Sequence, residues 1–244
     1  MQIITVAVIK GGTGKTATCA AMAQAAAHEG KRVLCVDLDA QANLTAALGA
    51  DRTAPGAYNL LQGAFILDCI QQTPQNIDVI AGSPALAADR PKQANSIFRL
   101  SNALEQIQKH YDLIVIDTPP SFCQLTYEAL QAATGLLIAI CADADSFNGM
   151  QLILDIAKEI KRTNKKLKPL GCIITQYDKR PKIARYMRDM IEEQGNKMKC
   201  PLLGEVRQGV AIQEARALRR NLFEYAPKSK PAQDYKAIYN KIIK

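Results

Sequence analysis

The fold depends on the stretch Lys10-Gly11-Gly12-Thr13-Gly14-Lys15-Thr16, a glycine-rich loop near the start of a 244-residue chain. It lies between an apolar run, Ile3–Ile9, and an alanine-rich segment from Ala17 to about Glu29. A strand, a glycine-rich turn and a helix in this order direct successive backbone N–H groups at one point, where the helix N-terminus adds partial positive charge. The stretch therefore predicts a loop that binds the β- and γ-phosphates of a nucleotide, with Lys15 on the phosphates and the Thr16 hydroxyl on Mg²⁺.

The loop departs from the ordinary phosphate-loop pattern in two places. That pattern requires a glycine where this chain has Ile9, and it asks for no lysine at position 10. Lys10 would crowd Lys15 if both served the same phosphate. Here the chain resembles the deviant Walker-type ATPases, and among them the ParA/Soj partition ATPases. The resemblance implies that Lys10 crosses a dimer interface to the nucleotide of the partner subunit; the alternative is a loop lysine in water.

Apolar runs alternate with helix-like segments along the whole chain. The strand-like runs are Ile3–Ile9, Val33–Asp37, Ile77–Ala81, Leu113–Asp117, Leu136–Cys141 and Leu170–Thr175. The expected helices include Leu60–Ile70, Asn95–His110, Phe147–Lys161 and Lys182–Gln194. Continuous rather than alternating apolar runs indicate a parallel sheet that is buried on both faces. We expect an α/β fold with a doubly wound, mostly parallel sheet, helices on both faces, and one P-loop ATPase domain over residues 1–244.

Acidic residues end two of these runs. The first set is Asp37-Leu38-Asp39-Ala40-Gln41-Ala42-Asn43, where the family has a proline in place of Ala40. The resemblance implies that Asp39 positions the attacking water and acts in catalysis with Lys10, while Asp37 contributes to the Mg²⁺ environment. A structural alternative makes Asp39 the N-cap of a helix at Gln41–Leu48.

The other acid is Asp117, which follows Leu113-Ile114-Val115-Ile116 and precedes Thr118-Pro119-Pro120. This order is typical of a Walker B strand, whose acid holds Mg²⁺ through water. The expected magnesium set is therefore Thr16, Asp37 and Asp117. The two prolines stiffen the departing loop, which suits a switch that senses the γ-phosphate.

A further nucleotide contact is expected at the end of the run near residue 175. The residues Thr175, Gln176, Tyr177 and Asp178 resemble the family loop that borders the adenine. These four residues complete the predicted nucleotide-binding set, whose other members are Lys10, Gly11, Gly12, Thr13, Gly14, Lys15 and Thr16. The resemblance implies that the ligands of this site are ATP and Mg²⁺.

The net charge of +8 is unevenly distributed. Residues 151–244 hold 22 Lys and Arg against 10 Asp and Glu, a net of +12, whereas the first 150 residues carry a net of −4. Such an asymmetry indicates a polyanionic partner for the C-terminal half. The segment Val206–Arg220 resembles the ParA region that carries DNA-binding basic residues, although Ala211 replaces a frequent arginine and Arg216 a proline. The candidates for DNA contact are Arg207, Arg216, Arg219 and Arg220, with Lys158–Lys168, or Lys182, Arg185 and Arg188, as alternatives.

The C-terminal segment has helical spacing of its apolar residues, at Tyr235, Ile238, Tyr239, Ile242 and Ile243. This face suits docking on the sheet, with a membrane-surface helix like that of MinD as the alternative.

No apolar run reaches about 18 residues, so no membrane span is expected. Seven cysteines without a C-x-x-C spacing argue against a zinc site and suit a reducing cytosol.

The resemblance implies a ParA-type ATPase that forms an ATP-dependent homodimer and binds double-stranded DNA without sequence preference. A ParB-like centromere-binding adaptor protein would prompt hydrolysis and release, in the cytoplasm and on the nucleoid. The alternatives are a MinD-like membrane-surface positioning ATPase, an iron-protein-like electron carrier using Cys123, and a small-molecule ligase.

Overall fold

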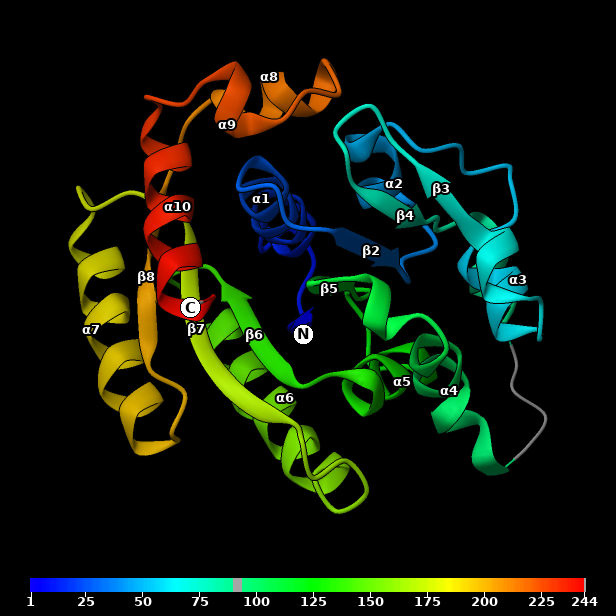
Figure 1. Cartoon of the computed structure of the whole chain (residues 1–244). Helices are drawn as coiled ribbons and strands as arrows, with labels where there is room; N and C mark the ends of the chain where they lie inside the picture. Colours follow the sequence, from blue (N-terminus) through cyan, green and yellow to red (C-terminus); the bar gives the residue numbers. More distant parts are fainter. Residues whose placement is uncertain (90–93, 244) are drawn as a thin grey trace.

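The computed structural model describes residues 1–89 and 94–243. Its central element is an eight-stranded sheet in the order β3-β4-β2-β5-β1-β6-β7-β8 (Figure 1). The strands are β1 (Gln2–Ala7), β2 (Val33–Asp37), β3 (Ile70–Gln72), β4 (Asp78–Ile80), β5 (Leu113–Asp117), β6 (Gly135–Ile140), β7 (Lys168–Tyr177) and β8 (Leu202–Arg207). Neighbouring strands are parallel except for β3 and β4, which are antiparallel. The predicted α/β fold with a mostly parallel sheet is confirmed.

The sheet is buried on both faces because successive residues of each strand point to opposite sides. In β1, Ile4 and Val6 pack into the core on the face that α1 (Lys15–His28) covers. Ile3 packs into the core on the opposite face. Helices α2 (Asn43–Leu48), α8 (Ala211–Ala217), α9 (Leu222–Tyr225) and α10 (Lys230–Ile242) share the face of α1.

The opposite face is covered by the remaining helices. These are α3 (Ala57–Leu61), α4 (Arg99–Glu105), α5 (Gln124–Ala132), α6 (Ala144–Ile160) and α7 (Lys182–Lys197). Four short 3₁₀ turns, η1 (Ile66–Cys69), η2 (Pro84–Ala88), η3 (Ala94–Phe98) and η4 (Gln108–His110), connect elements in the middle of the chain.

The order of the strands places a crevice at the carboxyl end of β1. The chain leaves β1 toward β2 on one side of the sheet, whereas β6 adds to its other side. In doubly wound sheets, ligands bind outside the carboxyl ends of the strands at such a reversal. The glycine-rich loop follows β1 directly and therefore lies at this point.

The C-terminal helix α10 packs on the sheet beside α1 (Figure 1). Tyr235 and Tyr239 are each 1% exposed. The Tyr235 hydroxyl lies 3.2 Å from the Thr18 hydroxyl, and the Tyr239 hydroxyl donates to Glu29 at 2.8 Å. Docking of this apolar face, rather than its display to a membrane surface, is confirmed. None of the helices in the described part of the chain is long and apolar enough to cross a membrane.

Both edge strands, β3 and β8, were missing from the strands expected from sequence. Strand β8 includes Gly204, Glu205 and Arg207, so it does not form an apolar run. The helix expected over Leu60–Ile70 is wrong: α3 ends at Leu61, and Gly63 adopts a left-handed φ of 98° that interrupts the helix. The helix expected over Asn95–His110 is divided into η3, α4 and η4.

Candidate nucleotide-binding site

The glycine-rich loop has the backbone conformation of an anion cradle. Gly12 and Gly14 adopt left-handed φ values of 74° and 79°. A Cβ atom on Gly14 would lie 3.2 Å from the Thr175 side chain, so this position also requires close approach. Helix α1 begins at Lys15 without a side-chain N-cap. Its first N–H groups are therefore available to an anion at the helix terminus.

Lys15 lies inside the site. It is 6% exposed, and its ammonium donates to the Lys10 carbonyl at 3.0 Å. Burial lowers the pKa of Lys15, and the negative charges of Asp117 and Asp39 partly oppose that change. A buried cation at the start of a helix can bind phosphate oxygens that replace the solvation it has lost.

The end of β7 anchors the loop through two side chains. The Thr175 hydroxyl donates to the Thr13 carbonyl at 2.6 Å, and the Gln176 amide donates to the Gly12 carbonyl at 2.7 Å. Both residues line the cavity beside the loop. Tyr177 ends β7, and Asp178 forms an exposed ion pair with Arg180 at 2.7 Å; neither belongs to the cavity lining. Of the predicted adenine loop, the structure thus brings Thr175 and Gln176 to the cavity.

Asp117 is a buried carboxylate at the end of β5, close to Thr16 and Lys15. Neither of its oxygens has a hydrogen bond of ordinary geometry within residues 1–89 and 94–243. Burial and then the neighbouring Asp37 raise the pKa of Asp117 to about 7, while the Thr16 hydroxyl and Lys15 oppose the rise. Such a group is costly unless a cation compensates it. The Asp117 carboxylate and the Thr16 hydroxyl are oxygen donors of the kind that Mg²⁺ prefers.

Asp37 has a different environment from Asp117. Its carboxylate accepts hydrogen bonds from the Thr45 N–H at 2.9 Å, the Thr45 hydroxyl at 2.7 Å and the Asp39 N–H at 3.1 Å. Burial raises the pKa of Asp37, and the bonds from Thr45 oppose the rise. The structure places Asp37 where it holds the first turn of α2 and adds negative charge beside Asp117.

Asp39 faces the cavity and does not cap a helix. Its carboxylate accepts from the Gln41 N–H at 3.0 Å, while α2 begins only at Asn43. The residue at the cap position is Ala42, in a left-handed conformation with φ 51°. The N-cap interpretation of Asp39 is wrong because this turn separates the aspartate from the helix.

The Lys10 side chain forms ion pairs with acidic residues of its own subunit. Its ammonium lies 2.7 Å from Asp143 and 3.6 Å from Asp145. The hydrogen bond to Asp143 raises the pKa of Lys10. Asp143 is also the N-cap of α6, where it accepts from the Ser146 N–H at 2.8 Å. Within the described residues no group of three or more His, Cys, Asp or Glu is arranged to hold a metal ion.

The cavity beside the loop has a volume of about 800 Å³. Besides the loop and Asp39, it is lined by Ala17, Ala20, Ala21 and Gln24 of α1 and by residues of the segment 206–216. Sequence reasoning assigned this C-terminal segment to DNA contact and missed its place in the cavity. The segment follows β8, whose carboxyl end lies at the same edge of the sheet as the loop, and because β8 was not expected from sequence this position was not predicted.

The four candidate arginines for DNA contact have different surroundings. Arg207 forms a two-pronged ion pair with Asp234, at 2.8 and 2.6 Å, and Arg216 donates to Asn43 at 2.7 Å. Both line the cavity. All four arginines are exposed, but Arg219 and Arg220 do not line the cavity; the guanidinium of Arg220 lies 5.5 Å from the Tyr225 ring centre.

Comparison with known proteins agrees with this geometry. A family profile described as an AAA domain matches residues 1–169. The chromosome-partitioning ATPase Soj of Thermus thermophilus is 31% identical over 236 residues, which cover 96% of this chain and 92% of that protein. The chain belongs to the ParA/Soj family of P-loop ATPases. This family assignment accounts for the loop with two lysines and for the parallel sheet behind it.

Two further proteins resemble this ParA/Soj-family ATPase over nearly its whole length. The sporulation initiation inhibitor protein Soj of Bacillus subtilis is 30% identical, covering 96% of this chain and 95% of that protein. A crystal structure of cobyrinic acid a,c-diamide synthase from Mycobacterium smegmatis, with bound ATP analog and magnesium, superposes with a TM-score of 0.84 at 26% identity. That alignment covers 98% of this chain and 93% of the other.

Proposed function

We propose that this chain is an ATP-driven DNA-partition switch that alternates between a DNA-bound dimer and a released monomer. The observation that carries the proposal is the pair of lysines in one loop: Lys15 is buried and lines the cavity beside the loop, whereas Lys10 is outside the cavity lining and binds Asp143. A single nucleotide site in one subunit needs only the first. We infer one ATPase domain over residues 1–244, because the strands of the described residues form a single sheet.

Mg·ATP is the ligand that fits the site. The N–H groups of residues 11–16 and the Lys15 ammonium would hold the phosphates, while Thr16 and Asp117 would hold Mg²⁺. A relative of the same fold was crystallised with an ATP analog and magnesium. Asp39 lines the cavity, and one of its carboxylate oxygens accepts a hydrogen bond from the Gln41 N–H. This carboxylate would orient the attacking water.

Dimerisation would transfer Lys10 from Asp143 to the nucleotide of the partner subunit. The exchange replaces one carboxylate by phosphate oxygens, so the charge on Lys10 stays paired. The isolated protein should hydrolyse ATP slowly, so that the ATP-bound dimer persists until a partner acts on it. A ParB-like adaptor would accelerate hydrolysis by supplying or ordering a further cation. An arginine supplied in trans raises the rate by about 10³–10⁵ in GTPases; we expect less here because Lys10 already contributes.

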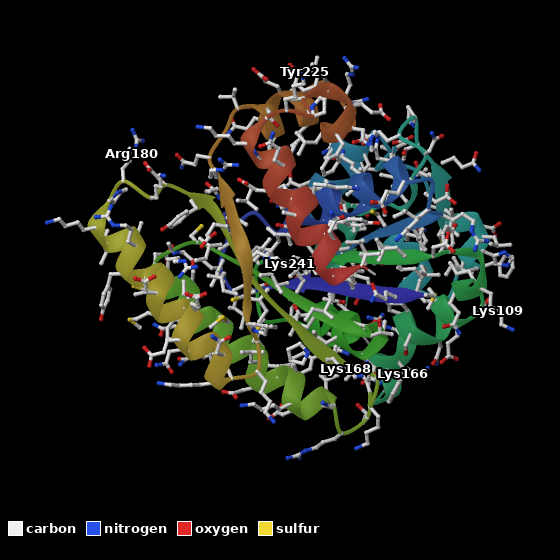
Figure 2. All side chains as sticks on the ribbon, turned by 60° about the vertical axis from the view of Figure 1, so that its left-hand side comes forward. Lys109, Lys166, Lys168, Arg180, Tyr225 and Lys241 are labelled. Carbon is white, nitrogen blue, oxygen red and sulfur yellow. The ribbon has the colours of Figure 1, made fainter. Side chains whose placement is uncertain are left out.

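DNA contact is proposed for the exposed end of α8 and the segment after it. Arg219 and Arg220 are exposed and form no ion pair among the described residues. Figure 2 shows Tyr225, close to these arginines in the chain, at the opposite end of the molecule from Lys166 and Lys168. Lys168 begins β7, so the basic stretch 158–168 lies at the far end of the strands from the nucleotide loop. We therefore propose that Arg219 and Arg220 make the ATP-dependent DNA contact. Binding to chromosomal DNA would place the protein on the nucleoid.

The proposal is tested by measuring duplex DNA binding with ATP, with ADP and without nucleotide, over a range of salt concentrations. We expect tight binding only with ATP, equal for unrelated sequences. The slope of log K against log salt should change by about 0.9 for each DNA phosphate that the protein no longer neutralises. The variant Arg219→Ala with Arg220→Ala should flatten the slope and retain ATP binding. Equal DNA binding in all three nucleotide states would contradict the switch.

A further inference from the structure

Arg216 and Asn43 are far apart in the chain but contact each other beside the glycine-rich loop. Arg216 lies on α8 in the C-terminal part of the chain, and Asn43 begins α2 immediately after the Asp39 loop. The Arg216 guanidinium donates to the Asn43 side-chain oxygen at 2.7 Å. Both residues line the cavity that holds the glycine-rich loop. The contact therefore connects α8 to the start of α2 within the cavity lining.

The charge on Arg216 is not neutralised by this contact. The Asn43 amide is neutral and accepts one of the five N–H donors of a guanidinium. Arg216 forms no ion pair with any carboxylate in residues 1–89 and 94–243. By contrast, the charge of Arg207, which lines the same cavity, is paired with the carboxylate of Asp234. A cavity-lining arginine with unused donors is suited to an anion, and phosphoryl oxygens match its planar fork.

The helix that carries Arg216 is held in place at both ends. Before α8, the Arg207–Asp234 pair ties the chain to α10. After α8, the Gln75 amide donates to the Arg219 carbonyl at 3.0 Å, and the buried Gln24 side chain receives a hydrogen bond from the Leu222 N–H at 3.3 Å. A donor on such a supported element loses little conformational freedom when it binds a ligand.

We infer that Arg216 is a nucleotide-binding residue of this chain: it contacts the phosphate groups of the bound nucleotide from α8, in addition to the contacts from the glycine-rich loop. This inference rests on the proposed function. It removes Arg216 from the DNA-contacting set and leaves Arg219 and Arg220 there. Because Asn43 belongs to the segment that carries Asp39, the same contact also holds that segment beside the phosphates.

The test compares the affinity for Mg·ATP of the unaltered full chain, Arg216→Ala, Arg216→Lys and Arg52→Ala by isothermal titration calorimetry. Arg52→Ala is the matched control, since it removes an exposed guanidinium from the turn after α2. We expect Arg216→Ala to bind Mg·ATP about 10- to 100-fold more weakly, the loss typical of one charge-assisted hydrogen bond or two. The affinity of Arg216→Lys for Mg·ATP should lie between those of Arg216→Ala and the unaltered chain. The affinity of Arg52→Ala should equal that of the unaltered chain.

A second measurement separates nucleotide contact from DNA contact. At ATP concentrations that saturate Arg216→Ala, its affinity for duplex DNA should equal that of the unaltered chain. An Arg216→Ala protein that binds Mg·ATP normally, or one that loses DNA affinity at saturating ATP, would overturn the inference and leave the proposed function standing. If the unaltered chain binds no Mg·ATP, both fail. Thermal unfolding of each variant without nucleotide shows whether it is folded.

Discussion

The ammonium of Lys10 lies 2.7 Å from the Asp143 carboxylate, so the lysine that distinguishes this loop is bound within its own subunit. The two side chains are 32% and 40% exposed. An ion pair at this degree of exposure contributes on the order of 1 kcal/mol. It is strong enough to bias the position of Lys10 and weak enough for phosphate oxygens to replace it.

Asp143→Asn should promote ATP-dependent dimerisation. The substitution removes the charge that holds Lys10, while asparagine is as good an N-cap for α6 as aspartate. We expect a dimer dissociation constant about 2- to 5-fold lower with a slowly hydrolysed ATP analogue, measured by analytical ultracentrifugation. Asp145→Asn is the control, because Asp145 lies farther from Lys10, at 3.6 Å, and is 85% exposed. A dimer that forms no more readily in Asp143→Asn than in the control would count against the intrasubunit restraint.

The two lysines should separate binding from dimerisation. Lys15→Ala removes the buried cation of the phosphate cavity and should abolish nucleotide binding. Lys10→Ala leaves that cavity intact and should bind ATP normally, yet neither dimerise productively nor hydrolyse it. Calorimetry and light scattering with an ATP analogue measure the two properties. Normal dimerisation and turnover of Lys10→Ala would exclude a role for Lys10 across the interface.

Asp39→Ala should retain ATP and accumulate as a dimer. The Asp39 carboxylate faces the cavity and does not cap α2, so its loss should remove water positioning with little effect on the fold. Single-turnover hydrolysis should slow by about 10²-fold or more, with a longer dimer lifetime. Hydrolysis at the rate of the unaltered chain would show that another group orients the water.

Asp117→Asn should stabilise the protein without nucleotide and eliminate Mg²⁺-dependent hydrolysis. The pKa of Asp117 is raised to about 7 in the folded chain, against 3.8 ordinarily. A raised carboxyl pKa means that the folded state binds the proton more tightly, so this group costs stability as the pH rises from about 4 through 7. Asparagine removes that cost, which amounts to at most about 4 kcal/mol above pH 7.

Urea unfolding of both proteins between pH 4 and pH 8, without Mg²⁺ or nucleotide, measures this difference. The variant and the unaltered chain should be equally stable near pH 4 and diverge as the pH rises. A constant difference across that range would mean that the Asp117 carboxylate is already compensated in the folded chain.

Much of this fold could be predicted from local patterns. The expected runs Val33–Asp37 and Leu113–Asp117 coincide with β2 and β5, because a strand buried on both faces must be apolar at nearly every position. The edge strands β3 and β8 were missed, since an edge strand needs fewer apolar residues. The prediction of a helix over Leu60–Ile70 is wrong at Gly63, which adopts a left-handed φ. That backbone conformation cannot be predicted from composition alone.

The glycine-rich loop, the acids at the strand ends and the parallel sheet could all be predicted from sequence, because each follows from spacing within a few residues. The partner of each functional side chain, by contrast, depends on how the strands are ordered in the sheet. Lys10 meets Asp143 across 133 positions, Thr175 meets the loop across 162, and Arg216 meets Asn43 across 173. These contacts exist because the strand order brings the carboxyl ends of β1, β2, β6, β7 and β8 to one edge of the sheet. Local spacing carries no information about such pairings, since the same motifs could be connected by other strand orders.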